Sequence, residues 1–289
     1  MSSELKVPHA LPARLLNFGC GRTYHPEWIN LDAVPVSPEV IAHDLRDPFP
    51  YASSDFDGVY GSHVLEHLEP QAGMRLLREC FRILKPDGIV RIVVPDLETI
   101  ARFYLQSLEG AIAGNADARM RYEWIMLELY DQATRTATGG AMAAYLRGSM
   151  NQRAAQFVAD RIGEETISCI AVRTTRQSAP TRMLQRVRSG AAALRSMLAC
   201  ACTLPFMGLE GCAALREGLF RRSGEVHQWM YDRYSLTQAL ARAGFVGARS
   251  CAADASDIPD FARYGLETAA GRPRKPDSLY VEARKPRST

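Results

Sequence analysis

The chain has 289 residues, 47% of them hydrophobic and 23% charged, and a formal net charge of +3 at pH 7. These values lie near the averages for soluble globular proteins, so they exclude wholesale disorder and predict one decorated α/β domain in preference to two small ones. The modest charge is spread along the chain, so it predicts neither a nucleic-acid-binding stripe nor a surface for an acidic partner.

The cysteines indicate a reducing compartment. There are seven, an odd number without a paired CxxC framework, and no signal peptide is recognisable at the N-terminus. We therefore expect a cytoplasmic location. No apolar run reaches the roughly 18 to 20 residues of a membrane-spanning helix, so no span is expected, although Met197 to Leu209 comes closest.

Short apolar runs in the first hundred residues predict four β-strands, at residues 14–18, 28–31, 40–43 and 57–61. The first strand enters a tight turn that contains Gly19 and Gly21. The second strand ends at Asp32 and the third at Asp44. Because only about a dozen residues separate Gly19 from Asp32, any helix between the first two strands must be short or absent.

A helix is predicted after the fourth strand. Leu77, Cys80, Phe81 and Leu84 recur at the spacing of a buried helical face, and Pro70 suits the first turn of that helix.

A turn at residues 85–88, whose glycine can adopt a positive φ, ends the helix. Residues 89–94 are apolar apart from Arg91 and predict a central parallel strand. Asp96 can cap a further helix that runs to about Leu108. Strands that alternate with helices predict a doubly wound sheet.

The strand signals fade after residue 110 and return near residue 224, with helical, arginine-bearing segments between them. Later elements are a helix at 232–243 and strands at 245–251 and 278–283. The predicted fold is α/β: a Rossmann-like, seven-stranded, mostly parallel sheet with a helical insertion after strand five. About 25 residues separate the last two strands, too many for a simple hairpin, so this excursion is a candidate functional segment with possible acceptor-binding residues Arg263, Tyr264, Arg272 and Arg274.

The glycine turn and the strand-end carboxylates suit a nucleoside ligand. Glycines let the backbone approach a ligand, and a carboxylate after the second strand can accept hydrogen bonds from both ribose hydroxyls. Asp44 could accept from the adenine amino group while Leu45 packs on the base. Each aspartate alone is more often a turn residue, but the ordered set of Gly19, Gly21, Asp32 and Asp44 favours a binding site.

Three segments resemble the class I S-adenosylmethionine (SAM)-dependent methyltransferases. Residues 16–21 (LNFGCG) resemble motif I of that family, residues 54–60 with 64–68 resemble its fourth-strand motif, and residues 84–88 (LKPDG) resemble the turn before its fifth strand. The resemblance implies SAM as the cofactor. It also implies a SAM-binding core at 1–108, a helical insertion or cap at 109–223 and the C-terminal part of the core at 224–289.

In this family the glycine loop holds the methionine part of the cofactor, the second-strand acid holds the ribose, and residues near strands three and four contact the adenine. Asn17 stands where the family usually has an acidic residue, so it can form hydrogen bonds without charge. The cofactor-binding residues that the resemblance implies are Asn17, Gly19, Cys20, Gly21, Asp32, Asp44, Leu45, Ser62 and His63.

A narrower resemblance, carried by residues 225–236, 243–245 and 274–282, is to bacterial methyltransferases associated with surface-polysaccharide assembly. It implies methyl transfer to an oxygen of a glycan or glycan precursor. A small metabolite or lipid acceptor, and a SAM-binding module without catalysis, remain alternatives, and a dehydrogenase is the enzymatic rival. No nucleic-acid partner is expected.

His227 and Tyr231 are the candidate catalytic residues. They lie just before the helix that leads to strand six, and an imidazole that is neutral near pH 7 can take a proton from a sugar hydroxyl. The alternative is equally weighted: Trp229 and Tyr231 anchor this segment and His227 is a packing residue.

Two metal-like patterns are discounted. Residues 63–67 (HVLEH) match the HxxEH pattern of zinc proteases, but no third ligand is evident, so no metal is expected there. Cys200 and Cys202 lie in an apolar stretch where cysteine commonly serves as a small hydrophobic residue.

The last feature is a basic stretch without acidic residues. With an apolar face at helical spacing, it could attach the protein to the surface of the inner membrane, although an arginine-coated helix that packs on the domain is the somewhat favoured alternative. Its basic residues are Arg173, Arg176, Arg182, Arg186, Arg188 and Arg195.

Overall fold

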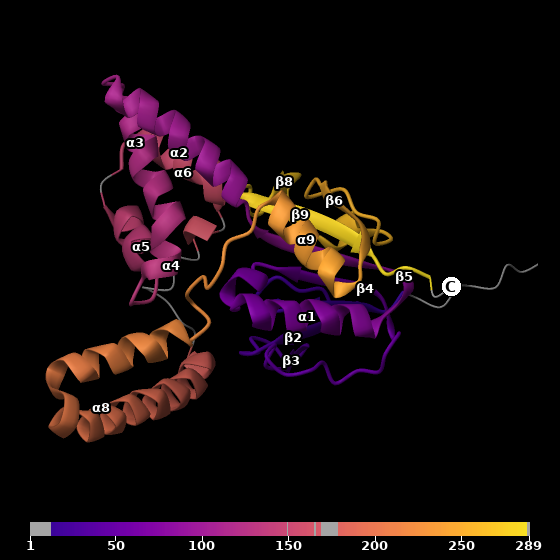
Figure 1. Ribbon diagram of the computed structural model, residues 1–289, viewed down its shortest axis with the longest axis horizontal. Helices are drawn as coiled ribbons and strands as arrows, with labels where there is room; N and C mark the ends of the chain where they lie inside the picture. Colours follow the sequence, from indigo (N-terminus) through magenta and orange to yellow (C-terminus); the bar gives the residue numbers. More distant parts are fainter. Residues whose placement is uncertain (1–12, 149, 165, 169–178, 288–289) are drawn as a thin grey trace, which may run out of the picture.

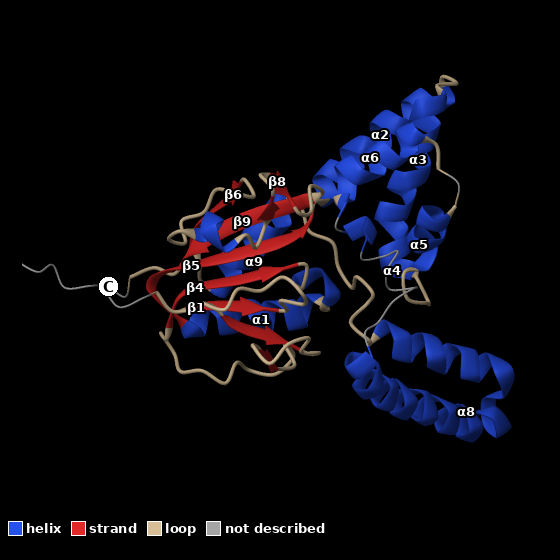
Figure 2. Cartoon of the chain, turned by 180° about the vertical axis from the view of Figure 1, so that it is seen from behind, coloured by secondary structure: helices blue, strands red, loops and turns tan. Residues whose placement is uncertain are grey.

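The computed structural model describes residues 13–148, 150–164, 166–168 and 179–287. A seven-stranded sheet forms its centre, with the order β3-β2-β1-β4-β5-β9-β6 (Figures 1 and 2). The strands are β1 (Leu15–Phe18), β2 (Ile29–Asp32), β3 (Val40–Ala42), β4 (Phe56–Ser62), β5 (Leu84–Pro95), β6 (Val246–Cys251) and β9 (Ser278–Arg284).

The strand directions confirm the predicted fold. Strands β1 to β5 are parallel to one another, and β9 is antiparallel to both β5 and β6. This is the Rossmann-like sheet of the class I methyltransferases. Each predicted strand is present, and apolar runs located most of their ends to within two residues.

The start of β5 differs from the prediction. Leu84, expected on the helical face, is the first residue of β5 and pairs with Phe56, and the register then shifts before Gly58 pairs with Ile89. The positive φ of 65° in this turn belongs to Asp87, so the expectation for its glycine was wrong. Gly88 is needed for space, because a Cβ there would lie 2.9 Å from the carbonyl oxygen of Lys85.

Two helices cover one face of the sheet: α1 (Pro70–Ile83) and α9 (Arg233–Ala243) (Figure 1). Asp232 caps α9 by accepting from the backbone N–H of Ser235 at 2.7 Å. Both helices bury apolar side chains against the strands, including Leu77, Cys80, Leu236 and Leu240.

The other face is covered by the excursion between β6 and β9. In the described chain no helix follows β1, β2 or β3, so this face lacks the helices of a doubly wound sheet. Ile258, Phe261 and Leu266 of the excursion instead pack against Trp28 and Tyr60. The segment also forms η3 (Phe261–Tyr264) and a small hairpin of β7 (Thr268–Ala269) and β8 (Arg272–Pro273). It is therefore a structural cover of the sheet.

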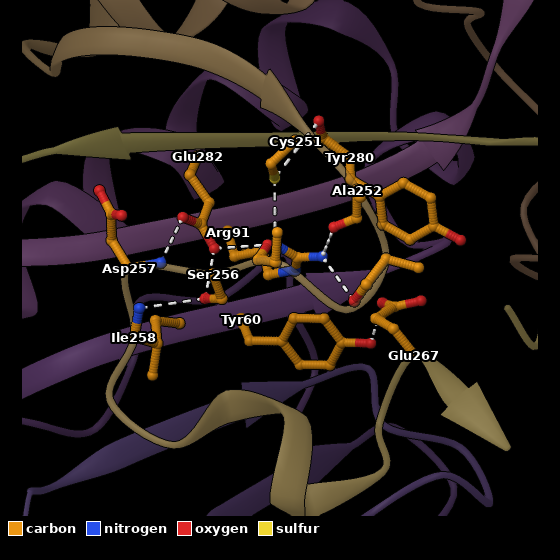
Figure 3. A network of polar contacts seen from close by, with 12 residues as sticks. Tyr60, Arg91, Cys251, Ala252, Ser256, Asp257, Ile258, Glu267, Tyr280 and Glu282 are labelled. Carbon is orange, nitrogen blue, oxygen red and sulfur yellow. Dashed lines mark hydrogen bonds and ion pairs between the residues drawn. The ribbon is translucent and has the colours of Figure 1, made fainter. Parts of the chain in front are cut away.

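Arg91 ties this cover to the sheet (Figure 3). Its side chain has no solvent exposure and forms a 2.8 Å ion pair with Glu282 of β9. It also donates to three backbone carbonyls of the excursion, those of Ala252, Ala253 and Ala255, at 2.8 to 3.1 Å. Arg91, the one charged residue of the predicted central strand, therefore supplies hydrogen-bond donors to carbonyl groups of the irregular excursion that would otherwise be buried without partners.

A helical cap follows β5. It begins with α2 (Leu97–Ile112), whose N-cap Asp96 accepts from the N–H of Glu98, as predicted. The cap buries its own apolar cluster around Trp124 and Val158. Its other elements are α3 (Ala116–Met126), the π-helical η2 (Leu127–Asp131), α4 (Gln132–Thr134), α5 (Gly140–Arg147) and α6 (Gln152–Ile162).

The last helix before α9, α8 (Ala179–Arg221), is not straight. Gly208 has non-helical backbone angles (φ 64°, ψ −163°), and both views show two arms folded back on each other, away from the sheet and the cap (Figures 1 and 2). Within the described residues, Met197–Arg221 is long and apolar enough to cross a membrane by length and composition alone. The bend divides that stretch, so it is not one straight span. Arg173 and Arg176 lie outside the described residues.

Candidate functional site

The glycine loop and Asp32 form one hydrogen-bonded unit at the carboxyl ends of β1 and β2. Oδ2 of Asp32 accepts from the N–H of Gly21 at 2.8 Å, and Oδ1 accepts from the N–H of Val34 at 2.8 Å. A carboxylate oxygen has two lone pairs, so each can still accept a ligand hydroxyl. The half-buried Asp32 therefore suits the ribose role.

The two glycines of the loop serve different purposes. Gly19 has a φ of 62°, and a Cβ there would lie 2.3 Å from Cγ2 of Val64, so Gly19 lets the loop pack against the segment after β4. Gly21 has a φ of 54°, and nothing within 4 Å would meet its Cβ. The open side of the loop is thus at Gly21, where a ligand can approach the backbone.

Asn17 and Cys20 support the loop from inside. Asn17 is 1% exposed, and its amide donates to the carbonyl oxygen of Thr23 at 3.1 Å and to Asn30 at 3.2 Å. Cys20 is buried, and burial, followed by the charge of Asp32, raises the pKa of its thiol to about 12. Both side chains hold the shape of the loop, whereas its backbone is what faces a ligand.

The predicted adenine-binding residues after β3 are Asp44 and Leu45. Asp44 pairs with Arg46, whose Nε lies 2.9 Å from Oδ1, and this hydrogen bond lowers the pKa of Asp44 to about 2. Leu45 is partly buried and packs against the core. The adjacent His43 was not predicted. Its buried Nε2 has no partner among the described residues, so it is available to a ligand.

Ser62, the last residue of β4, and His63 are the other predicted adenine contacts. Ser62 interacts with Tyr60 and Glu267. The Nε2 of His63 lies 2.8 Å from Oγ of Ser278 on β9, and its Nδ1 lies 3.4 Å from Oε1 of Glu66. His63 therefore adjoins the polar cluster around Glu66, whereas Ser62 is turned toward the cover of the sheet.

A buried polar cluster lies next to the glycine loop, two residues beyond Val64. It consists of Glu66 and His67 of η1 (Leu65–His67) and His227, which enters from the segment before α9. Glu66 is 0% exposed and His227 5% exposed. Oε2 of Glu66 and Nδ1 of both His67 and His227 have no hydrogen-bond partner among the described residues, and Oε1 of Glu66 lies 3.4 Å from Nδ1 of His63. Orphaned groups this deep normally have a ligand, a water or an ion as partner.

Backbone hydrogen bonds hold the cluster together. The N–H of His227 donates to the carbonyl oxygen of Gln132 in the cap at 2.9 Å, and the N–H of Gln228 donates to the carbonyl oxygen of Glu66 at 2.7 Å. The rings of His67 and His227 meet edge to face, with centroids 4.7 Å apart. The cap and the core are therefore joined at the cluster.

The cluster has an unusual charge state. Burial lowers the pKa of His227 to about 3 and that of His63 to about 4. Burial alone would raise the pKa of Glu66, but the surrounding histidines outweigh it and lower that pKa to about 2. At neutral pH the cluster thus contains a carboxylate among neutral imidazoles that can accept protons.

Tyr231, the second predicted catalytic residue, is part of the apolar core beside α1. Burial, followed by the charge of Glu66, raises the pKa of its hydroxyl to about 12, so the phenol stays protonated. Its backbone carbonyl accepts from the N–H of Leu97 at 3.0 Å and fixes the start of α2. Tyr231 can donate a hydrogen bond, but it is not placed as a base.

The polar residues of the excursion lie on the cover of the sheet. Arg263 pairs with Glu27 and stacks on Tyr264, and Nε of Arg274 donates to the carbonyl oxygen of Gly265 at 2.9 Å. Arg272 belongs to the exposed hairpin strand β8. The structure does not bring these residues together with the polar cluster.

The cluster also has the spacing of a metal site, since one ligand atom from each of Glu66, His67 and His227 lies within 4.8 Å of the others. Two of its side chains, Glu66 and His67, belong to the discounted HxxEH pattern, and His227 supplies the third group that the sequence did not reveal. His63 faces Ser278, and the third group comes from a distant part of the chain.

Comparisons with known proteins identify a domain in the first hundred residues. Residues 16–92 match the family model described as "Methyltransferase domain". No curated protein sequence is a significant match. The solved structures of similar fold include a putative methyltransferase of Haloferax volcanii in complex with the Trm112 methyltransferase activator, at 12% identity and a TM-score of 0.38, covering 98% of this chain and 86% of that one.

A second structure is a SAM-dependent methyltransferase of Archaeoglobus fulgidus, at 14% identity and a TM-score of 0.36, covering 94% of this chain and 86% of that one. A third is the [4+2]-cyclase SpnF, at 22% identity and a TM-score of 0.24, covering 28% of this chain and 38% of that one. The chain thus spans well under half the length of the cyclase. These likenesses are distant, and the assignment depends on the domain match and the strand order.

Residues 16–92 thus match a methyltransferase domain, and the strand order is that of the class I fold, for which SAM is the expected cofactor. The residues present fit that cofactor: the open loop backbone at Gly21 suits the methionine part, and Asp32 has free lone pairs for the ribose hydroxyls. His43 and Leu45 lie at the next strand end, where the adenine is expected.

Proposed function

We propose that the protein transfers the methyl group of SAM to a hydroxyl oxygen of a glycan or glycan precursor, with His227 as the general base. The observation that carries this proposal is the buried cluster of Glu66, His67 and His227 beside the glycine loop. A hydroxyl acceptor must lose a proton, and this cluster contains groups able to receive it.

SAM supplies an electrophilic methyl group on a sulfonium. The acceptor oxygen forms the new C–O bond as the C–S bond breaks, the bonding pair leaves with the sulfur as S-adenosylhomocysteine, and the hydroxyl proton passes to His227. The imidazolium that results is stabilised by the Glu66 carboxylate, because both are shielded from water. A low pKa makes His227 a weak base, so positioning must supply much of the catalysis.

Two features support a glycan acceptor. The tail segment that contains His227 carries the resemblance to methyltransferases associated with surface polysaccharides. The helical cap also meets the core at the cluster, through the hydrogen bond from His227 to Gln132. Transfer to a small metabolite or lipid, and SAM binding without catalysis, are the competing outcomes of the same experiment.

The test is transfer of labelled methyl from SAM to glycan precursors, small metabolites and lipids extracted from a bacterial cell envelope. With the best acceptor, His227→Ala should lower turnover by about 10² to 10⁴-fold and leave S-adenosylhomocysteine affinity nearly unchanged. Glu66→Gln should lower it less. Gln228→Ala is the matched control, because that neighbouring side chain turns away toward Arg221.

The acidic limb of the pH profile gives a second readout. Because the folded pKa of His227 is about 3, wild-type turnover should not fall between pH 8 and pH 5 as it would for an ordinary histidine base. Parental turnover in His227→Ala would refute the base assignment. Loss of wild-type activity on chelation, with metal bound by the wild type alone, would make the cluster a metal site instead.

A further inference from the structure

The α8 hairpin exposes apolar side chains at its bend. Phe206 is 88% exposed, Leu209 80% and Met207 65%, although the surrounding arms are helical. A large apolar side chain gains free energy when it leaves water, and a contiguous exposed group of them marks an interaction surface. We name residues Leu204 to Leu209 the hairpin tip.

The hairpin is a built structure and not a frayed helix. Cys200 and Cys212 are buried between the arms, and the Sγ of Cys212 lies 3.3 Å from the carbonyl oxygen of Cys200. A Cβ on Gly211 would lie 2.3 Å from Cβ of Met207, so Gly211 allows the chain to bend tightly at Gly208. The close packing of small residues leaves the larger apolar side chains to face outward.

The charge of the hairpin is concentrated and positive. Residues 179–222 contain seven arginines and two glutamates, a net charge of +5, whereas the whole chain carries only +3. Residues 197–209, which include the tip, have no charged residue. Arg216, Arg221 and Arg222 are exposed toward the end of the second arm, away from the tip.

This separation of apolar tip and basic arms matches one side of an anionic bilayer. From Cys200 to Gly208 a helix rises about 12 Å at 1.5 Å per residue. One leaflet of the hydrocarbon core is about 15 Å thick. The second arm begins with the exposed Glu210 directly after the tip, so the insertion is shallow: the apolar tip enters one leaflet and the Glu210 carboxylate stays at the interface. Arg216, Arg221 and Arg222, the exposed arginines of the second arm, would then lie on the phosphate side of the tip, where each contributes electrostatic attraction.

We propose that the tip of the α8 hairpin inserts into one leaflet of an anionic membrane and holds the methyltransferase core at its surface. This attachment is independent of the acceptor proposed above. It differs from attachment by the arginine-rich helix alone, because the apolar tip supplies the part of the binding that salt does not screen.

The test is co-sedimentation of the full chain with vesicles of phosphatidylcholine and phosphatidylglycerol (7:3) and with phosphatidylcholine alone, in 0.05 and 0.5 M NaCl. The wild type should bind the anionic vesicles more tightly and keep measurable binding in high salt. The double substitution Phe206→Ser and Leu209→Ser should weaken binding at least about 30-fold. Ile112→Ser is the matched control, because Ile112 is 78% exposed at the end of α2, outside the hairpin.

S-adenosylhomocysteine affinity of each variant reports whether the core is still folded. Replacement of Arg216, Arg221 and Arg222 by Gln should lower binding in low salt more than in high salt. Equal binding by the tip variant and the wild type would overturn the insertion. Wild-type self-association that the tip substitutions abolish, without vesicle binding, would assign the tip to a second copy of the chain and also overturn it.

Discussion

At the scale of single residues, the carboxyl of Asp277 gives a pH-dependent prediction. It lies 9% exposed just before β9, and burial, followed by the nearby charge of Glu128, raises its pKa from 3.8 to about 7. The folded state therefore holds a proton that the unfolded state releases near pH 4. Stability from this group is complete below pH 4 and is lost as the pH rises toward 7. Asp277→Asn, which keeps the neutral form, should thus stabilise the protein at pH 8 relative to the wild type, by up to about 4 kcal/mol at 1.4 kcal/mol per pKa unit. At pH 5 the gain should be much smaller. Urea denaturation of both proteins at the two pH values measures this, and an equal difference at both would contradict the assigned titration.

At the scale of elements, the cover of the second sheet face depends on Arg91. Replacing Arg91 by Met would leave the Glu282 carboxylate buried at 2% exposure without its cation, and it would orphan the carbonyls of Ala252, Ala253 and Ala255. Breaking a buried pair in this way costs about 3 to 5 kcal/mol. The double substitution Arg91→Met and Glu282→Leu should recover part of that loss, because no unpaired charge remains. Equilibrium unfolding in urea tests both, and a single-variant cost below about 1 kcal/mol would show that the network does not hold the excursion.

The same element shows which parts of the fold the sequence could predict. Apolar runs and strand-end aspartates located the strands because their signals are local, and Asp96 marked a helix start by capping. The structural role of the excursion could not be predicted, because its apolar residues replace the helices that this face lacks, and no local periodicity reports contacts between distant segments. Glu66 was passed over for a similar reason: its partner His227 lies far along the chain, and only the fold joins them.

At the scale of the whole molecule, SAM binding should stabilise core and cap together, because hydrogen bonds from His227 to Gln132 and from Asp96 to Asp277 join them. A ligand at 100 times its Kd adds about 2.7 kcal/mol to the free energy of unfolding. At about 2 to 4 °C per kcal/mol, S-adenosylhomocysteine should raise Tm by about 5 to 10 °C, whereas NAD should not. In Asp32→Ala the ribose hydroxyls lose a charged acceptor worth about 1.5 to 3 kcal/mol per hydrogen bond, so the same ligand concentration should give almost no shift. The Tm without ligand must be measured in parallel, because Asp32 also accepts from Gly21 and Val34. Asp47→Ala, an exposed aspartate beyond the next strand, should keep the full shift. A full shift in Asp32→Ala would refute the ribose assignment, and a shift with NAD instead would refute SAM as the cofactor.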